Sequence, residues 1–412
     1  MSLFYFLISI FSNTFRGGLS FVTGLIIARS LGPENYGHYI FLVGTIIAIN
    51  QILDLGTSNA FVTFISQRPR GKKFINYYRV WQLVQFLLLI VLMGILFPDS
   101  WISSIWMGED RMLVVLSFAA VFLQQNAWQT VVNIAESKRL TKTVQGLWLS
   151  LVALHFLLVI IFWLGGLLTL EVLFWLIAIE YLAGLLFGEK LVNKPDNPNL
   201  EDNQVRFKSV FDEYVVFCVP LIILNWSGFA RLFADRWFLQ KFGGAIEQSF
   251  YGVGFQFFVV CSLFTISIQK IFLKEIAEAR ERQDLERVRV LYTKLTRFLF
   301  TVSAIFSGLL MPWSREIIQI FLGDSYLSGQ GTLAVMLLLP INQSLGQTTH
   351  ALYLVSQKTK EQAKFGITIN AIGILGAYFV LAPKNAWLPG LDMGSLGMAL
   401  KMLLLQIISV NI

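Results

Sequence analysis

Residues 3–28, LFYFLISIFSNTFRGGLSFVTGLIIA, form an apolar run, and residues 29–37, RSLGPENYG, end it with a polar turn. A run of about 20 apolar residues is long enough to cross the hydrocarbon core of a bilayer as a helix. The run has no basic segment before it and is longer than a signal-peptide core, so we interpret it as a retained membrane span. This stretch therefore predicts an integral membrane protein.

Runs of the same kind recur along the whole chain. Of the 412 residues, 56% are hydrophobic and only 14% are charged, which is too little polar surface for a soluble protein of this size. We predict an all-α polytopic membrane protein with about twelve transmembrane helices. The predicted spans are residues 3–28, 38–66, 80–98, 112–135, 144–165, 170–188, 213–239, 248–273, 290–312, 331–355, 364–383 and 395–412.

The basic residues are unevenly distributed among the connections. Most of the 32 Lys and Arg residues lie in the connections after the even-numbered spans, at residues 68–79, 138–142, 190–208, 270–297 and 358–364. Because short cytoplasmic loops carry the excess of Lys and Arg, both termini are predicted to be cytoplasmic. This bias accounts for the net charge of +7 without nucleic acid as a partner. The two cysteines, Cys218 and Cys261, lie in predicted spans and are interpreted as packing residues.

The two halves of the chain resemble each other. Residues 31–37, LGPENYG, resemble residues 242–252. The second segment begins with Phe-Gly where the first has Leu-Gly, ends with Tyr-Gly as the first does, and is four residues longer. A repeat of six spans returns the chain to its starting side, so the halves should be related by an axis along the membrane normal. We predict six-helix bundles at residues 1–189 and 210–412 around a central cavity, with a cytoplasmic linker at residues 190–209.

The segment IARSLGPENYG at residues 27–37, followed by Asp54-Leu55-Gly56, resembles bacterial polysaccharide-biosynthesis flippases. These belong to the multidrug/oligosaccharidyl-lipid/polysaccharide exporter superfamily, abbreviated MOP below. The resemblance implies two bundles forming a V. It also implies that an undecaprenyl-pyrophosphate-linked oligosaccharide is flipped from the cytoplasmic to the periplasmic leaflet of a bacterial inner membrane. The implied partners are that lipid-linked oligosaccharide, the lipid bilayer and the polysaccharide polymerase machinery.

Two arginines inside predicted spans are candidate substrate-binding residues. Arg16 lies midway along the first span, and aligning the glycines of the repeat places Arg231 opposite Ser20, one turn from Arg16. An intramembrane charge usually faces a cavity or a partner, and a guanidinium binds phosphate oxygens bidentately. The alternative is an internal salt bridge, which for Arg231 would be made with Asp235 at i+4.

Amide side chains form a stripe in each half, and they are the other predicted substrate contacts. The first stripe is Gln125, Gln129 and Asn133, and the second is Gln343, Gln347 and His350. Amides donate and accept hydrogen bonds, which suits sugar hydroxyls lining a shared cavity. The alternative is hydrogen bonding between packed helices.

Intramembrane carboxylates are the candidate ion-coupling groups. Asp54 and Asp235 could titrate or bind a cation, so coupling to protons or sodium is one expectation. For Asp54 the favoured interpretation is structural, with the carboxylate capping a backbone amide at the break before Gly56. Glu180 leaves the same two alternatives open. Lys401 is expected to snorkel from a span end.

Several kinds of site are absent from the sequence. It contains no G-x-x-x-x-G-K-[ST] loop, and its three histidines make no recognisable metal site, so we predict neither ATP hydrolysis, nor a metal, nor another cofactor. A multidrug or cation antiporter would be expected to place acidic rather than basic residues in the cavity. A membrane polysaccharide polymerase or ligase would need a large outer loop. The predicted function is therefore a flippase for O-antigen, capsule or exopolysaccharide assembly, which is not an enzyme.

Overall fold

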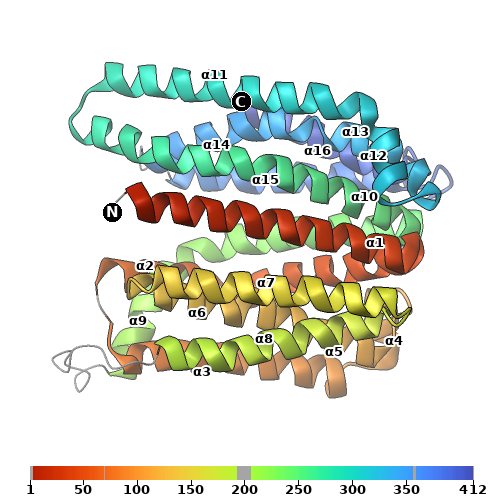
Figure 1. The fold of residues 1–412 in the computed structure, drawn as a ribbon, viewed down its shortest axis with the longest axis horizontal. Coiled ribbons are helices and arrows are strands. Elements are labelled where there is room, and N and C mark those ends of the chain that lie inside the picture. Colours follow the sequence, from red (N-terminus) through yellow and green to blue (C-terminus); the bar gives the residue numbers. More distant parts are fainter. Residues whose placement is uncertain (1–2, 69, 193–205, 356–358, 412) are drawn as a thin grey trace. The chain divides into compact units, whose positions relative to one another are not determined.

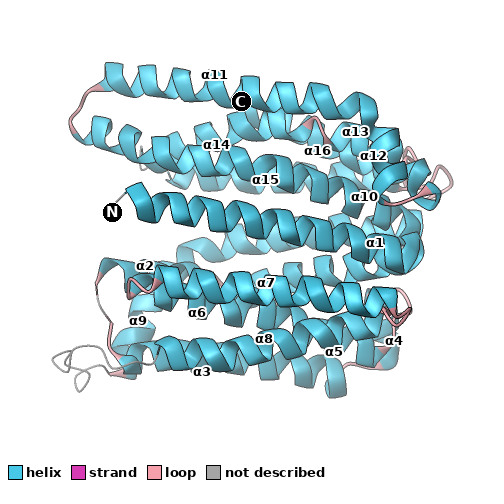
Figure 2. Ribbon diagram, viewed as in Figure 1, coloured by secondary structure: helices cyan, strands magenta, loops and turns pink. Residues whose placement is uncertain are grey.

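The computed structural model describes residues 3–68, 70–192, 206–355 and 359–411. These residues form helices joined by turns and loops, with no strand among them (Figures 1 and 2). The short η elements are π-helical (η1, η2) or 3₁₀-helical (η4, η5, η6). In chain order the elements are α1 (Leu3–Asp54), α2 (Thr57–Gln67), α3 (Lys72–Val91), η1 (Leu92–Leu96), α4 (Asp99–Ile105), α5 (Arg111–Phe122), η2 (Leu123–Ala127), α6 (Trp128–Ser137), α7 (Thr141–Leu164), α8 (Leu170–Val192), α9 (Phe207–Cys218), η4 (Val219–Leu221), α10 (Ile222–Glu281), α11 (Leu285–Leu310), η5 (Met311–Trp313), α12 (Ser314–Phe321), η6 (Asp324–Gly329), α13 (Gln330–Met336), α14 (Leu339–Val355), α15 (Thr359–Leu381) and α16 (Gly394–Asn411).

Eight helical segments of the described chain are long and apolar enough to cross a membrane. Two of them, Asn13–Asp54 and Phe207–Leu263, each cover parts of two predicted spans. The predicted spans 112–135 and 331–355 coincide with helices α5 to α6 and α13 to α14, which are not among the eight. The chain is thus a multi-pass membrane protein, and the prediction of an all-α membrane fold is confirmed.

The two longest helices break at matching glycines. Within α1, Gly32 has φ 72° and ψ 171°, and within α10, Gly244 has φ 79° and ψ −178°. A positive φ with extended ψ is a conformation that glycine adopts far more readily than other residues. The same irregularity therefore occurs at the same point of both repeats. It also shows that Gly32 is equivalent to Gly244, one residue later than the sequence comparison suggested.

The described chain forms two compact units. Unit 1 comprises residues 1–41 and 234–412, and unit 2 comprises residues 42–233, so α1 and α10 each continue from one unit into the other. In unit 2, α8 packs against α5, α6 and α7; in unit 1, α16 packs against α13, α14 and α15. Each unit thus takes helices from both predicted bundles. The bundle boundaries themselves remain a prediction, and residues 193–205 of the linker lie outside the described residues.

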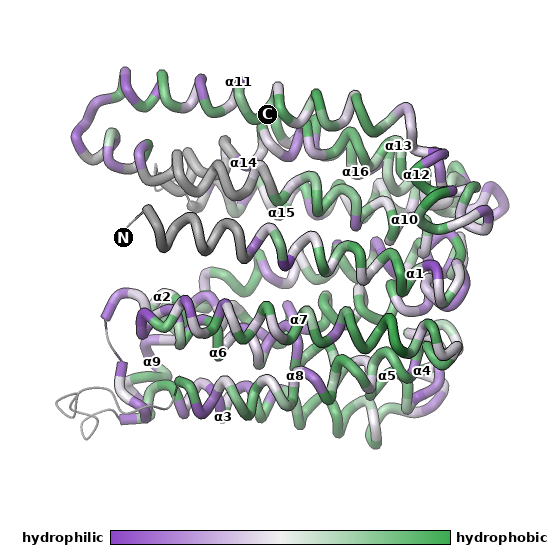
Figure 3. Tube along the Cα trace, viewed as in Figure 1, coloured by the Kyte–Doolittle hydropathy of each residue, from purple (hydrophilic) through white to green (hydrophobic). Residues whose placement is uncertain are grey.

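The helices on either side of residues 282–284 extend beyond the predicted spans. Helix α10 ends at Glu281 and α11 begins at Leu285, so much of the predicted connection 270–297 is helical. Figure 3 shows the turn between the two helices as hydrophilic, in contrast to the green hydrophobic stretches further along α11. Polar helix ends of this kind project beyond the apolar part that a bilayer can cover.

Two glycines allow α1 and α10 to cross closely within unit 1. A Cβ atom on Gly37 would lie 1.8 Å from the carbonyl oxygen of Ala245, so no larger residue fits there without moving the backbone. Gly252 faces the side chain of Ile40, where an added Cβ would lie 2.8 Å from Cγ1. The repeat aligns these two glycines, and each packs against the other repeat. Such close approach is the usual reason for glycine at a helix crossing in membranes.

The first helix is also fixed to unit 1 by polar and aromatic contacts. Phe21 packs edge-on against Phe257 of α10, with 4.9 Å between ring centroids. At the other end of the span, the hydroxyl of buried Tyr326 donates to the carbonyl of Ala28 at 2.7 Å. These contacts hold residues 21–28 of α1 against α10 and η6.

Candidate functional site

A cavity of about 570 Å³ lies in unit 1 between α1 and α10. Its volume falls within the range typical of small-molecule sites. Helix α1 supplies one wall and α10 the other, and the lining residues are Asn13, Arg16, Gly17, Ser20, Phe21, Phe255, Gln256, Val259, Val260 and Leu263. None of these ten lining residues is acidic. Arg16 therefore determines the formal charge of the lining.

Arg16 is half-buried and is oriented by its own helix. Its Nη2 atom donates to Oδ1 of Asn13, three residues earlier, at 2.7 Å. Gly17 and Ser20 of the same helix also line the cavity, and Gly17 packs against Leu263, where an added Cβ would lie 2.6 Å from Cδ1. A guanidinium carries five N–H donors, so a bond to Asn13 is compatible with binding an anion. The sequence placed Arg16 in a cavity, and the structure agrees; substrate binding by Arg16 stays a prediction.

Gln256 is a second polar group of this cavity, and sequence reasoning did not identify it. Its Oε1 atom is buried and has no hydrogen-bond partner among the described residues. The side chain extends over Gly24 of α1, where an added Cβ would lie 1.8 Å from Nε2. A glutamine in the middle of the predicted span 248–273 was the available signal. The signal is weak because this glutamine forms no stripe with other amides.

The other predicted substrate contacts do not line this cavity. Arg231 is half-buried on α10 and belongs to unit 2, as do Gln125 and Gln129. Both glutamines are exposed, and Gln129 donates to Asn133 of the same helix at 3.0 Å. The stripe predicted in the first half therefore exists as an exposed polar face, and its contact with sugar stays a prediction.

The second stripe includes a contact between packed helices. Gln343 of α14 accepts a hydrogen bond from Nε2 of Gln406 of α16 at 3.1 Å. This arrangement corresponds to the alternative role for the stripes, hydrogen bonding between helices. Gln347 is half-buried on α14, whereas the side chain of His350 lies outside the described residues.

Amides that the sequence did not single out join the helices of unit 2. Gln82 of α3 donates to the hydroxyl of Thr130 at 2.9 Å, and Asn50 of α1 donates to Oδ1 of Asn126 at 3.2 Å. Asn126 lies in the π-helical segment η2, whose extra residue per turn changes the faces of the residues around it. Sequence spacing alone does not reveal this change.

Asp54 has the structural role that the sequence favoured. Helix α1 ends at Asp54, Leu55 and Gly56 both have positive φ, and α2 begins at Thr57. The Asp54 carboxylate accepts from the backbone N–H of Ser58 at 2.9 Å and from the hydroxyls of Thr57 and Ser58 at 3.1 and 2.8 Å. A carboxylate at a helix N-terminus satisfies free N–H groups and stabilises the helix. Ion coupling by Asp54 stays a prediction.

Asp235 forms a buried ion pair with Lys401. The two side chains are 7% and 3% exposed, and Nζ of Lys401 lies 2.6 Å from Oδ1 of Asp235. The expectation that Lys401 snorkels from a span end is wrong, because the residue lies inside α16 and its charge is compensated by Asp235 of α10. The pair joins residues 166 positions apart. The proposed ion-coupling role of Asp235 is not tested by this contact.

Glu180 also has a partner on a neighbouring helix. Nδ1 of His155, on α7, lies 2.7 Å from Oε2 of Glu180, on α8, and the glutamate is 3% exposed. The other carboxylate oxygen, Oε1, is buried without a hydrogen-bond partner in the described chain. Among the described residues, no three His, Cys, Asp or Glu side chains are grouped so that they could hold a metal ion.

No protein-family model and no curated protein matches the sequence. Solved structures do match over nearly the whole chain. An inward-facing multidrug resistance MATE family transporter of the MOP superfamily has a TM-score of 0.72 at 15% identity, covering 96% of this chain and 93% of that chain. The lipid II flippase MurJ, in an inward closed conformation, has a TM-score of 0.69 at 15% identity, covering 99% and 86%. The chain has the MOP transporter fold.

A third MOP structure, from Pyrococcus furiosus, has a TM-score of 0.62 at 14% identity and covers 98% of this chain and 94% of that chain. The report of that structure describes a binding pocket of reversed polarity and infers a different function from it. Within the MOP fold, similarity at this level of identity concerns the backbone. Backbone similarity does not distinguish a lipid flippase from a multidrug transporter. The side chains that line the cavity are the features that can differ between the two.

Proposed function

We propose that this protein flips an undecaprenyl-pyrophosphate-linked oligosaccharide from the cytoplasmic to the periplasmic leaflet of a bacterial inner membrane by alternating access. Such a flippase supplies the assembly of a surface polysaccharide. The observation that supports the proposal is Arg16, the one ionisable side chain among the ten described residues that line the cavity between α1 and α10. A MOP fold is shared by MATE transporters and MurJ, so the charge of the cavity is the feature that separates the candidate substrates.

The chemistry of the cavity suits the head of such a lipid. A pyrophosphate is a doubly substituted anion whose oxygens match the planar fork of a guanidinium. Gln256 and Ser20 add groups that both donate and accept, which sugar hydroxyls require. The apolar side chains of Phe21, Phe255 and Leu263 complete the walls. A cationic drug would bring its positive charge to Arg16 without an acidic lining residue to offset it.

The proposed reaction needs no covalent step by this chain. The protein provides an anion site and a path between leaflets, and energy would come from coupled protons or sodium. Asp54 and Asp235 remain the proposed coupling residues. The proposal includes the predicted orientation, with both termini in the cytoplasm, and delivery of the flipped lipid to a polysaccharide polymerase.

Flipping by the purified protein in proteoliposomes tests the proposal directly. A fluorescent undecaprenyl-pyrophosphate oligosaccharide would be followed by its accessibility to an external quencher. Arg16→Ala should lower the rate by about 10-fold to 100-fold, the loss expected for a charge-assisted hydrogen bond. Arg16→Lys should retain part of the rate, because it keeps the charge and loses the fork.

The matched control is Arg29→Ala, which removes an exposed arginine of the same helix outside the cavity. It should flip the lipid at the parent rate. Equal rates for Arg16→Ala and the parent would reject the proposed mechanism, provided that both proteins are reconstituted in equal amounts. Efflux of a cationic dye that survives Arg16→Ala, together with no flipping by the parent, would favour the multidrug alternative.

A further inference from the structure

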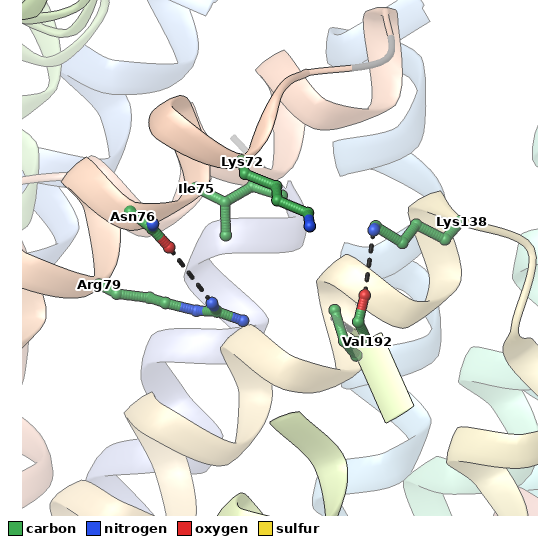
Figure 4. Close-up of a pocket in the computed structure, with 6 residues that line it drawn as sticks. All are labelled: Lys72, Ile75, Asn76, Arg79, Lys138 and Val192. Carbon is green, nitrogen blue, oxygen red and sulfur yellow. Dashed lines mark hydrogen bonds between the residues drawn. The ribbon is translucent and has the colours of Figure 1, made fainter. Parts of the chain in front are cut away.

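A second pocket, separate from the Arg16 cavity, lies in unit 2 and has a volume of about 250 Å³. It is formed where α3 begins and where α6 and α8 end (Figure 4). The lining residues are Lys72, Ile75, Asn76, Arg79, Lys138 and Val192. Of these six described side chains, three are cationic and none is acidic. The proposed function does not use this pocket.

The cationic groups are held in place by contacts around the pocket. Nζ of Lys138 donates to the carbonyl of Val192, the last residue of α8, at 3.0 Å. Nη1 of Arg79 donates to Oδ1 of Asn76 at 3.4 Å, and Nη2 forms an ion pair with Glu189 (Figure 4 shows the first of these). An ammonium has three donors and a guanidinium has five, so these contacts are compatible with an additional anion.

The six lining residues bring three positive charges and no negative charge to the pocket. Glu189 offsets one of the three cations. Helix α3 begins at Lys72, and its N-cap residue Gly71 supplies no side-chain cap. The unsatisfied N–H groups of a helix N-terminus favour a negative charge nearby, which adds to the effect of the lysines.

The surfaces of α3 and α8 one helical turn away from the pocket, toward the middle of each helix, are apolar and exposed. On α3, Val80 and Leu83 follow Asn76 and Arg79 by four residues, so they lie on the same face, and they are 58% and 54% exposed. On α8, Leu186 precedes Glu189 by three residues and is 63% exposed. A basic pocket bordered by exposed aliphatic side chains of membrane-spanning helices matches a phospholipid, with its phosphate above and its acyl chains below.

We propose that this pocket binds the phosphate of an anionic membrane phospholipid such as phosphatidylglycerol. Lys72 and Lys138 contact the phosphate, and Arg79, positioned by Asn76 and Glu189, adds a third cation to the pocket. The acyl chains lie along the exposed faces of α3 and α8. A bound lipid would tie the start of α3 to the ends of α6 and α8 on the side of the membrane where the predicted topology places the basic connections.

Lipid binding to the full-length protein, delipidated in detergent, tests this site. Phosphatidylglycerol would be titrated and bound lipid counted by native mass spectrometry, with phosphatidylcholine and inorganic phosphate in parallel. Lys72→Gln, which changes an exposed side chain, should weaken phosphatidylglycerol binding by about tenfold, as expected for a charge-assisted contact. Lys138→Arg should bind nearly as the parent does, and Lys72→Glu should bind more weakly than Lys72→Gln.

The matched control is Lys190→Gln, which removes one exposed positive charge of α8 outside the pocket. It should bind phosphatidylglycerol as the parent does. The proposal is overturned if Lys190→Gln weakens binding as much as Lys72→Gln, because the effect would then be general attraction to the basic surface. It is also overturned if inorganic phosphate at equal concentration displaces the lipid, or if phosphatidylcholine binds equally well.

Discussion

The two units each contain a pair of oppositely charged residue types inside the membrane-spanning helices, and the two pairs differ in chemistry. Unit 1 has Asp235 and Lys401, joined at 2.6 Å, and unit 2 has His155 and Glu180, joined at 2.7 Å. A lysine ammonium carries three donors, whereas an imidazole meets a carboxylate through a single ring nitrogen. The pair in unit 1 is therefore suited to a fixed link between helices. The pair in unit 2 is less enclosed, since the side chain of His155 is 17% exposed and that of Lys401 is 3% exposed.

The largest effect is expected for breaking the fixed pair. Lys401→Met leaves the buried carboxylate of Asp235 without its cation, which should lower the free energy of unfolding by about 3–5 kcal/mol. The double variant Asp235→Leu with Lys401→Met should recover most of this loss, because no buried charge remains. Chemical unfolding of the purified protein in micelles measures both, with Lys190→Met as the control for an exposed lysine. A single variant as stable as the parent would mean that the pair is not a structural link.

A smaller effect is expected for the pair in unit 2. Glu180→Gln keeps an oxygen that can accept from His155, so the free energy of unfolding should fall by only about 1 kcal/mol. Glu180→Leu removes the acceptor and leaves the imidazole unsatisfied, which should cost about 1–3 kcal/mol. The same unfolding assay compares the two. If Glu180→Gln destabilises the protein as much as Lys401→Met, the proposed difference between the units is wrong.

The smallest effect is expected at Asp54, a further intramembrane carboxylate of unit 2. Asp54→Asn retains a side-chain oxygen for the N–H of Ser58, so it should lower stability by a few tenths of a kcal/mol, whereas Asp54→Ala should lower it by about 1 kcal/mol. Transport measured on the same samples separates capping from coupling. A flipping rate that falls far more than stability in Asp54→Asn would assign the carboxylate an ion-coupling role in addition to its cap.

Much of the fold could be predicted because the bilayer constrains it strongly. Spans must be about 20 apolar residues long, so hydropathy alone located helices from residue 3 to residue 411. The sequence comparison paired Gly32 with Gly243, and the structure corrects this pair to Gly32 and Gly244, which share a backbone conformation that glycine adopts easily. The division into units could not be predicted, since it depends on which helices pack after α1 and α10 cross.

The site was predicted in part for a similar reason. Arg16 could be assigned to a cavity because an ionised group in the middle of a span is costly unless it faces water, an anion or a partner. Lys401 was misplaced because its partner is 166 residues away and the sequence offers no sign of that contact. Gln256 and the pocket around Lys72 were missed for the same reason, since their significance arises only from residues on other helices.

The composition of unit 1 has a consequence for how the protein is made. Residues 42–233 form unit 2 as one uninterrupted stretch, which can be completed while synthesis continues. Residues 1–41 emerge first but belong with residues 234–412, and the hydroxyl that holds Ala28 comes from Tyr326. The first helix therefore lacks its packing partners in unit 1 until more than half of the chain has been inserted into the bilayer. Arg16 acquires the opposite wall of its cavity only when α10 arrives, so this cavity is assembled late, after unit 2 is already complete.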